Sequence, residues 1–208
     1  PCLGFIALAF MLTPSCRLAA ALNSGAAFLK IDTGARPAAM GGAYTAVAED
    51  VNALYYNPGG LARLPKREFG ATHTQWLLDS KFDFIGYAQP TKMGTFGLGV
   101  TRLTYGGSEG RGSGRRAAGG FDASDTALSL GLGRTIRAEG LGALGDGSTS
   151  VGANVKYLES RIGPYSAATV AFDVGAVRSF SGRPMSLGVS ALNLGKGMRF
   201  LEQEDPLP

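Results

Sequence analysis

The sequence predicts an all-β protein, an antiparallel transmembrane β-barrel that holds a small N-terminal hatch with short helices. From residue 68 onward, apolar residues recur with a period of two, which is the pattern of a β-strand. The expected strands are ten to thirteen residues long, whereas soluble proteins use about five or six and a tilted strand needs ~9–11 to cross a bilayer. Glycine makes up 32 of the 208 residues and charged residues only 17%. This composition favours tight turns and closely packed backbone.

The first 21 residues are typical of a secretory signal peptide. Residues 3–12 form an apolar run that is shorter than the ~20 residues of a membrane helix and suits the centre of a signal peptide. Small residues end at Ala21, so we expect cleavage after it and a signal peptide at 1–21. The basic start of such a peptide is missing, so we expect it to be truncated. Cys2 and Cys16 both lie in it, which would leave a mature chain without cysteine, although Cys16 as a lipidated residue is an alternative.

Residues 22–66 form a glycine- and alanine-rich block that we expect to be the hatch. Residues 46–56 predict a helix of about three turns, stopped by Asn57 and Pro58. Gly41 and Gly42 permit close backbone approach or positive φ. Such a block is too rich in glycine to be an independent helical domain, so it should pack inside the β-structure.

Residues 67–208 are expected to form the barrel wall. Seven strands are predicted, at 68–78, 81–90, 94–105, 124–136, 150–161, 167–178 and 185–194. Large aliphatic residues such as Leu130 and Phe172 alternate with small or polar ones such as Gly131 and Asp173. In a membrane barrel the first face meets lipid and the second lines the lumen.

A secreted soluble β-sandwich, structural or adhesin-like, is the alternative, because it shows the same alternation with the faces exchanged. The strand length and the small size of the polar face favour the barrel. Residues 106–123 predict a long polar loop, which a barrel places outside the cell. Trp76, Phe82, Phe84 and Tyr105 fall near the strand ends, and we expect them in an interfacial aromatic belt.

The residue inventory argues against catalysis, metal binding and nucleic-acid binding. His73 is the only histidine, and no cysteine in the expected mature chain completes a zinc site. No G-x-S-x-G turn or phosphate-binding glycine loop occurs. The net charge of +4 is not accompanied by a nucleic-acid-binding motif. We therefore expect a non-enzymatic protein without cofactor, metal or nucleic acid.

Three carboxylates are the most informative charges of the chain. Glu49 and Asp50 lie in the expected hatch, and Asp173 lies on the small-residue face of a strand. An unpaired buried charge costs several kcal/mol, so each should have a partner, and Arg36 and Arg63 are candidates. The hypothesis is an ion pair that fixes the hatch to the wall; a gate opened by breaking that pair is the alternative.

Two segments carry a family resemblance. They are KIDTGARPAAMGGAYTAVAEDVNALYYNPGGLA at 30–62 and ATHTQWLLDSKFDFIGYAQP at 71–90. They resemble the PorV/PorQ family of outer-membrane proteins, within the FadL-like group of hydrophobic-compound transporters. Residues 57–62 are similar to the Asn-Pro-Ala-Gly-Leu-Ala signature of that group, with Gly59 in place of alanine. The resemblance implies a fourteen-stranded barrel, of which residues 67–208 would supply the first seven strands as an N-terminal fragment.

The resemblance also implies a function in the bacterial outer membrane. Its members pass hydrophobic compounds through a barrel whose hatch moves, or they serve as non-enzymatic components of protein secretion. The implied partners are outer-membrane lipid and either a hydrophobic small molecule or secretion-machinery proteins. The sequence does not choose between the two roles. The candidate hatch and ligand-path residues are Arg36, Gly41, Gly42, Glu49, Asp50, Asn57, Pro58, Gly59, Gly60 and Asp173.

Overall fold

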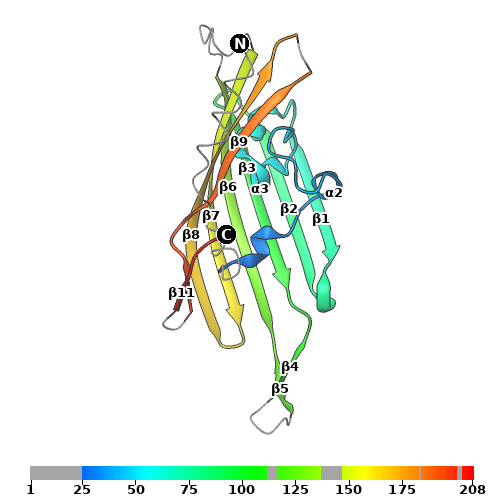
Figure 1. The fold of residues 1–208 in the computed structure, drawn as a ribbon, viewed down its shortest axis with the longest axis vertical. Coiled ribbons are helices and arrows are strands. Elements are labelled where there is room, and N and C mark those ends of the chain that lie inside the picture. The colour runs from blue at the N-terminus through cyan, green and yellow to red at the C-terminus, as the bar shows by residue number, and fades with distance from the viewer. Residues whose placement is uncertain (1–24, 112–116, 137–146, 183, 201–202) are drawn as a thin grey trace, which may run out of the picture.

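The computed structural model describes residues 25–111, 117–136, 147–182, 184–200 and 203–208 (Figure 1). The predicted signal peptide at 1–21 lies outside the described residues. The described chain is mostly antiparallel strand with a few short helices. The all-β prediction is therefore confirmed.

All seven predicted strands form and join one antiparallel sheet in the order β1-β2-β3-β6-β7-β8-β9. Their bounds are β1 Glu68–Gln75, β2 Lys81–Pro90, β3 Thr95–Thr104, β6 Ala123–Ile136, β7 Gly147–Ile162, β8 Tyr165–Phe180 and β9 Ser186–Gly195. Each strand pairs with its neighbour in sequence, so the sheet is a meander. Within the described residues β1 and β9 are its two edges, and the sheet is not closed.

Three segments differ from the predicted elements. The first strand ends at Gln75, because Leu77–Asp79 form a 3₁₀ turn, η4, in which Leu78 has a φ of 53°. The predicted loop at 106–123 is wrong in part, since it contains a hairpin of β4 Ser108–Arg111 and β5 Ala117–Phe121. A second hairpin, β10 Met198–Phe200 with β11 Gln203–Asp205, follows β9.

The hatch consists of short helical pieces, which are η2 Ala27–Lys30, α2 Ala35–Ala39, α3 Ala53–Tyr56 and η3 Pro58–Arg63. The predicted helix at 46–56 is therefore too long: only α3 is helical. Asp50 explains the difference, because its side-chain Oδ1 accepts the backbone N–H of Asn52 at 3.0 Å. A side chain that bonds nearby backbone in this way competes with helical hydrogen bonding.

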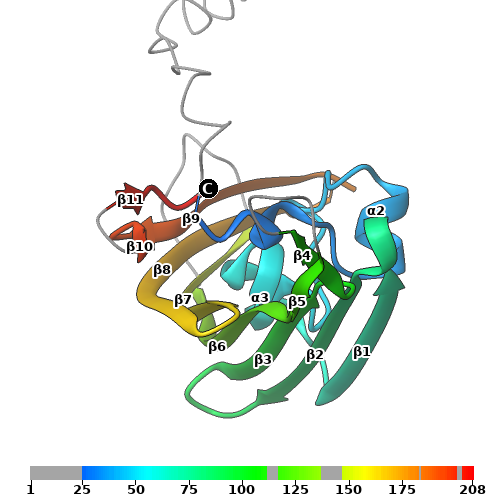
Figure 2. The same cartoon turned by 90° about the horizontal axis from the view of Figure 1, so that it is seen from below.

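The sheet curves into an open arc, and α3 lies on its concave side (Figure 2). On the convex face the large residues are exposed: Leu130 by 55%, Phe172 by 51% and Val189 by 67%. The small-residue face is turned toward the hatch, as the contacts of its glycines show. The predicted separation of large residues on the outer face from small residues facing the hatch is therefore confirmed.

The core lies between the concave face and the hatch, in two apolar clusters. One joins Phe28 and Leu29 of the hatch to Phe82 and Leu158 of the wall. The other is built around Tyr44, Leu54 and Leu61. Phe82 and Phe84 are buried on the inner side, so the aromatic-belt prediction is wrong for these two, whereas Trp76 and Tyr105 are about 40% exposed. No described helix is long and apolar enough to cross a membrane.

Candidate functional site

Glycines of the wall let the hatch backbone approach the sheet directly. A Cβ added at Gly133 would meet the backbone N of Ala62 at 2.6 Å, and one at Gly188 would meet the carbonyl O of Thr45 at 2.5 Å. Gly152 lies against the carbonyl of Pro58 in the same way, too close for any side chain. The site is thus a contact between two backbones, and it explains why this face of the sheet carries such small residues.

Asn57 links the hatch to two strands of the wall. Its amide Nδ2 donates to the carbonyl O of Thr45 at 2.8 Å, of Ala176 at 3.1 Å and of Val189 at 3.3 Å. Its Oδ1 accepts the backbone N–H of Gly59 at 3.0 Å, which caps η3. The side chain is completely buried. The predicted local hydrogen bond forms, and two bonds to strands β8 and β9 are added to it.

Pro58, Gly59 and Gly60 are buried at the start of η3. A Cβ at Gly59 would meet the carbonyl O of Gly175 at 2.9 Å, and one at Gly60 would meet that of Ala48 at 2.5 Å. Pro58 occupies the first turn of a helix, where a backbone N–H would have no partner within the helix, so the lack of an N–H in proline costs no hydrogen bond. The predicted turn motif is therefore the part of the hatch that touches the wall most closely.

Asp173 lies at the centre of a buried polar network on β7, β8 and β9. Its Oδ2 lies 2.9 Å from Lys156 Nζ and accepts from Asn154 Nδ2 at 2.9 Å. Its Oδ1 accepts the backbone N–H of Asn193 at 2.7 Å. Lys156 also donates to Asn193 Oδ1 at 2.9 Å. Asp173 is 0%, Asn154 1% and Lys156 2% exposed, so this ion pair is removed from water.

The network reaches the hatch through two further contacts. Asn154 Nδ2 donates to the carbonyl O of Leu54 at 3.1 Å. Lys156 Nζ lies 5.8 Å from the centre of the Tyr55 ring, within the range of a cation–π interaction. The Tyr55 hydroxyl lies 2.7 Å from the carbonyl oxygens of Leu29 and Ile31. Burial raises the pKa of the Tyr55 hydroxyl well above its usual range.

Glu49 does not fix the hatch to the wall. It pairs with Arg36 at 3.1 Å and with Arg63 at 3.5 Å, and all three residues belong to the hatch. The hydrogen bond to Glu49 raises the pKa of the Arg36 guanidinium. The predicted partners Arg36 and Arg63 are right for Glu49 only, because Asp173 pairs with Lys156. The predicted ion pair from hatch to wall is wrong. Backbone contacts, hydrogen bonds and the cation–π contact of Lys156 with Tyr55 join the two parts instead. One of the hydrogen bonds runs from the Val51 N–H to Glu68 Oε1 of β1 at 3.2 Å.

Asp50 organises the hatch internally. Its Oδ2 accepts from the Tyr44 hydroxyl at 2.8 Å and from Asn52 Nδ2 at 3.1 Å. Gly41 and Gly42 form the turn after α2, with φ of 62° and 76°, which is the left-handed conformation that glycine adopts without strain. These three residues do not contact the wall network.

His73 lies on the convex face and is exposed. Its Nδ1 lies 2.6 Å from Asp83 Oδ1. No group of three or more histidine, cysteine, aspartate or glutamate side chains in the described residues is arranged to hold a metal ion.

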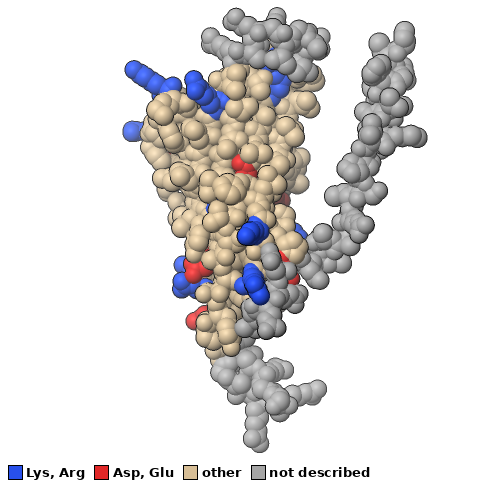
Figure 3. All heavy atoms as spheres, turned by 90° about the vertical axis from the view of Figure 1, so that its left-hand side faces the viewer, with Lys and Arg blue, Asp and Glu red and all other residues tan. Residues whose placement is uncertain are grey.

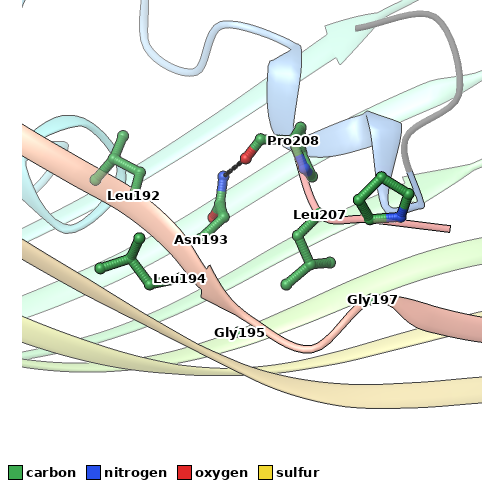
Figure 4. Close-up of a pocket in the computed structure, with 8 residues that line it drawn as sticks. Leu192, Asn193, Leu194, Gly195, Gly197, Leu207 and Pro208 are labelled. Atoms are coloured by element: carbon green, nitrogen blue, oxygen red, sulfur yellow. Dashed lines mark hydrogen bonds between the residues drawn. The ribbon is translucent and has the colours of Figure 1, made fainter. Parts of the chain in front are cut away.

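A pocket of about 560 Å³ opens beside the end of β9 (Figure 4). Leu192, Asn193 and Leu194 line one side, and Leu207 and Pro208 line the other. Asn193 Nδ2 donates to the carbonyl O of Pro208 at 3.1 Å. The pocket therefore lies directly next to the buried network around Asp173.

The sequence prediction missed Lys156, Asn154 and Asn193. Lys156 and Asn154 share a face with Asp173 by the period-two pattern, so this pattern could have suggested the pair. Asn193 could not be found this way, because it lies at an irregularity of the β8–β9 pairing and has a φ of 57°.

Comparison with known protein families gives one match. Residues 21–159 match the model of the family described as "Uncharacterised protein family (UPF0164)". The search among curated proteins found no match. The matched region contains the whole described hatch and strands β1 to β6, with most of β7. The chain belongs to the UPF0164 family.

Proposed function

We propose that this chain forms the hatch and part of the wall of an outer-membrane β-barrel of the PorV/PorQ type, within the FadL-like group. It acts without catalysis, either in the transport of hydrophobic compounds or as a component of protein secretion. The observation that carries the proposal is the opposite character of the two faces of one sheet: bulky aliphatic side chains are exposed, and glycines enclose the N-terminal segment.

The height of the exposed apolar band supports a membrane location. On the convex face of β7, the residues between Thr149 and Glu159 are Val151, Ala153, Val155 and Tyr157. The flanking polar residues Thr149 and Glu159 are about 33 Å apart along the strand at ~3.3 Å per residue, and a tilt of ~40° places them about 25 Å apart in height. Outer-membrane barrels have an apolar band of about this height.

The charge distribution agrees with this band. Figure 3 shows one face of the molecule, on which Lys and Arg atoms lie at the upper end, further charged atoms lie in the lower half, and the area between them is uncharged apart from one acidic patch. On β6, the exposed Arg134 follows Leu132 at one end of the band, and Thr126 precedes Leu128 at the other. Soluble proteins seldom expose so large a continuous apolar surface.

A soluble β-sandwich is less compatible with these contacts. A sandwich buries its bulky face against a second sheet. In the described residues the other two sheets are two-stranded hairpins, and Leu130, Phe172 and Val189 are about half exposed or more.

Membrane partitioning of the full-length protein tests the location. A barrel is extracted from the outer-membrane fraction only by detergent, and it migrates faster on a gel when the sample is not heated. Recovery of the protein in the soluble periplasmic fraction or the medium, with no heat-dependent shift, would contradict the proposal.

A removable cross-link separates transport from secretion. The Cβ of Val51 in the hatch lies 3.9 Å from the position of a Cβ added at Gly70 on β1, within the 3.5–4.5 Å range of a disulfide. The variant Val51→Cys/Gly70→Cys should lock the hatch when oxidised. A transporter with a moving hatch then loses uptake and regains it with reductant, whereas a secretion component keeps exporting its cargo. Each single cysteine variant is the control.

A further inference from the structure

A row of polar residues crosses the convex face of five adjacent strands at one end of the apolar band. In register order the row consists of His73, Asp83, Arg102, Thr126 and Glu159. The next convex row toward the middle of the sheet consists of Ala71, Ile85, Val100, Leu128 and Tyr157. The face therefore changes from apolar to polar within a single step of two residues along each strand.

A polar pocket of about 210 Å³ lies in this row. Arg102, Ser124, Thr126, Glu159 and Arg161 line it. Arg102 is paired with Thr126 across β3 and β6, and Ser124 with Arg161 across β6 and β7. The pocket is therefore a small open basin on the outer surface of three neighbouring strands, between two guanidinium groups.

The two arginines are held differently. Glu159 Oε1 accepts from Arg161 Nε at 2.7 Å and lies 2.7 Å from its Nη2. This pair orients Arg161 and leaves its remaining N–H groups for another acceptor. Arg102 is exposed and makes no ion pair with any described residue. Two guanidinium groups and one carboxylate leave the pocket with one net positive charge.

We propose that this pocket binds the phosphate group of an anionic membrane lipid. Guanidinium groups present a fork of N–H donors that matches phosphate oxygens, and the Ser124 and Thr126 hydroxyls add two donors. The apolar rows beside the pocket would cover the acyl chains of the same molecule. This inference rests on the proposed membrane location. If the apolar band lies in the bilayer, its end lies at the level of the lipid headgroups.

Native mass spectrometry of the full-length protein in detergent tests the site. The probes are phosphatidylglycerol, phosphatidylcholine and inorganic phosphate. We expect one strongly retained phosphatidylglycerol per chain. In the variant Arg102→Gln/Arg161→Gln its retention should fall at least tenfold, which corresponds to about 1.4 kcal/mol, because both charged hydrogen-bond donors to the phosphate are removed. Arg67→Gln, an exposed arginine between the hatch and β1, is the matched control and should retain the lipid.

Three results would overturn the lipid site. They are equal retention by the double variant and the parent, equal retention of both lipids, and displacement of phosphatidylglycerol by millimolar inorganic phosphate, which indicates a site for a free anion. Flotation with phosphatidylglycerol vesicles separates this inference from the proposed function. If the parent protein floats but shows no lipid selectivity, the site alone is wrong; if it does not float, both proposals are wrong.

Discussion

In strands β7 and β8 the side chains of the convex face differ sharply in polarity and exposure from those of the concave face. On the convex face Val155 and Phe172, which are cross-strand partners, are exposed by 44% and 51%. On the concave face their sequence neighbours Asn154 and Asp173 are exposed by 1% and 0%. At these positions the apolar side chains are outside and the polar ones inside, which reverses the arrangement of a soluble domain, although other concave residues of the same strands, such as Leu158, are apolar and buried.

This inversion indicates that the two faces meet different surroundings. The concave face has the hatch as its neighbour. Its polar groups form hydrogen bonds, and its glycines lie in contact with the backbone of the hatch. The convex face has no protein neighbour in the described residues, so its bulky side chains are exposed, and the proposed membrane location would supply an apolar surrounding for them. Five measurements can break or sharpen this comparison.

The largest effect is expected on the concave face, from Lys156→Met. Removal of one partner of a buried ion pair costs about 3–5 kcal/mol, because the other charge is left without compensation. Denaturant unfolding followed by the fluorescence of Trp76, the single tryptophan, measures it. Lys92→Met, at an exposed lysine, should be nearly neutral. A loss below 1 kcal/mol for Lys156→Met would mean that the Asp173 network is not closed to water.

On the convex face, Leu130→Arg distinguishes lipid from water directly. A lipid-facing arginine near the bilayer midplane costs about 2–4 kcal/mol in a barrel, whereas an exposed surface substitution in water is within ±0.5 kcal/mol. Equilibrium unfolding of the protein from lipid vesicles measures this change in free energy. A neutral result would contradict the membrane location and favour the soluble alternative.

The glycine contact is tested by Gly152→Val against its neighbour Ala153→Val. The first side chain would collide with the backbone of Pro58, and overpacking costs about 1–3 kcal/mol. The second points out of the convex face and should change stability by less than ~0.5 kcal/mol. Equal effects of the two variants would show that the hatch does not lie against β7.

Alkaline pH should lower the free energy of unfolding, because the Tyr55 hydroxyl in the hatch is buried. Because burial raises its pKa in the folded state, the hydroxyl stays protonated there while the unfolded chain ionises near its ordinary pKa of ~10. Its contribution is therefore complete below pH ~10 and falls by about 1.4 kcal/mol per pH unit above that, until the folded group ionises too. Unfolding at pH 9, 10 and 11 should show this slope, and Tyr55→Phe should reduce it. An unchanged slope in the variant would show that Tyr55 is not the group responsible.

The smallest effect is expected for Glu49→Gln. Glu49 bonds to Arg36 and Arg63 with about half of its side chain exposed, and such pairs contribute about 0–1 kcal/mol. In the same denaturation assay the variant should differ little from the parent, both at low salt and at high salt. A loss comparable to that of Lys156→Met would restore the hypothesis that Glu49 fixes the hatch.

The regular part of the fold could be predicted because its signal is local. The period-two pattern located all seven strands of the sheet, the two faces of the later strands β6 to β9, and for β2 even the bounds, but Phe82 and Phe84 of β2 were expected in the aromatic belt and are buried on the inner side. The hatch was harder: the apolar spacing of residues 46–56 favours a helix, but the Asp50 side chain bonds the backbone N–H of Asn52 and the helix begins only after it, at Ala53. The hairpin of β4 and β5 was hidden in glycine-rich sequence that has no alternating pattern.

The candidate site could be predicted only in part. The motif at Asn57–Gly60 and the charge at Asp173 could be found from the sequence. The first is a run of turn residues, and the second is a carboxylate on the small-residue face of a strand with clear alternation. The predicted ion pair from hatch to wall was wrong, since three carboxylates and two arginines can be paired in several ways. Their geometry selects the pair within the hatch.

By itself the sequence determined where the strands run and which residues share a face, because alternation along an extended chain is a property of neighbouring residues. Only the tertiary structure decided which groups of the hatch and the sheet meet. Asn57 reaches the carbonyls of Ala176 and Val189, more than a hundred residues away, and Lys156 finds Asp173 instead of an arginine of the hatch. Such partners depend on the curvature of the sheet and on the irregular pairing at Asn193, and neither feature is encoded by local spacing.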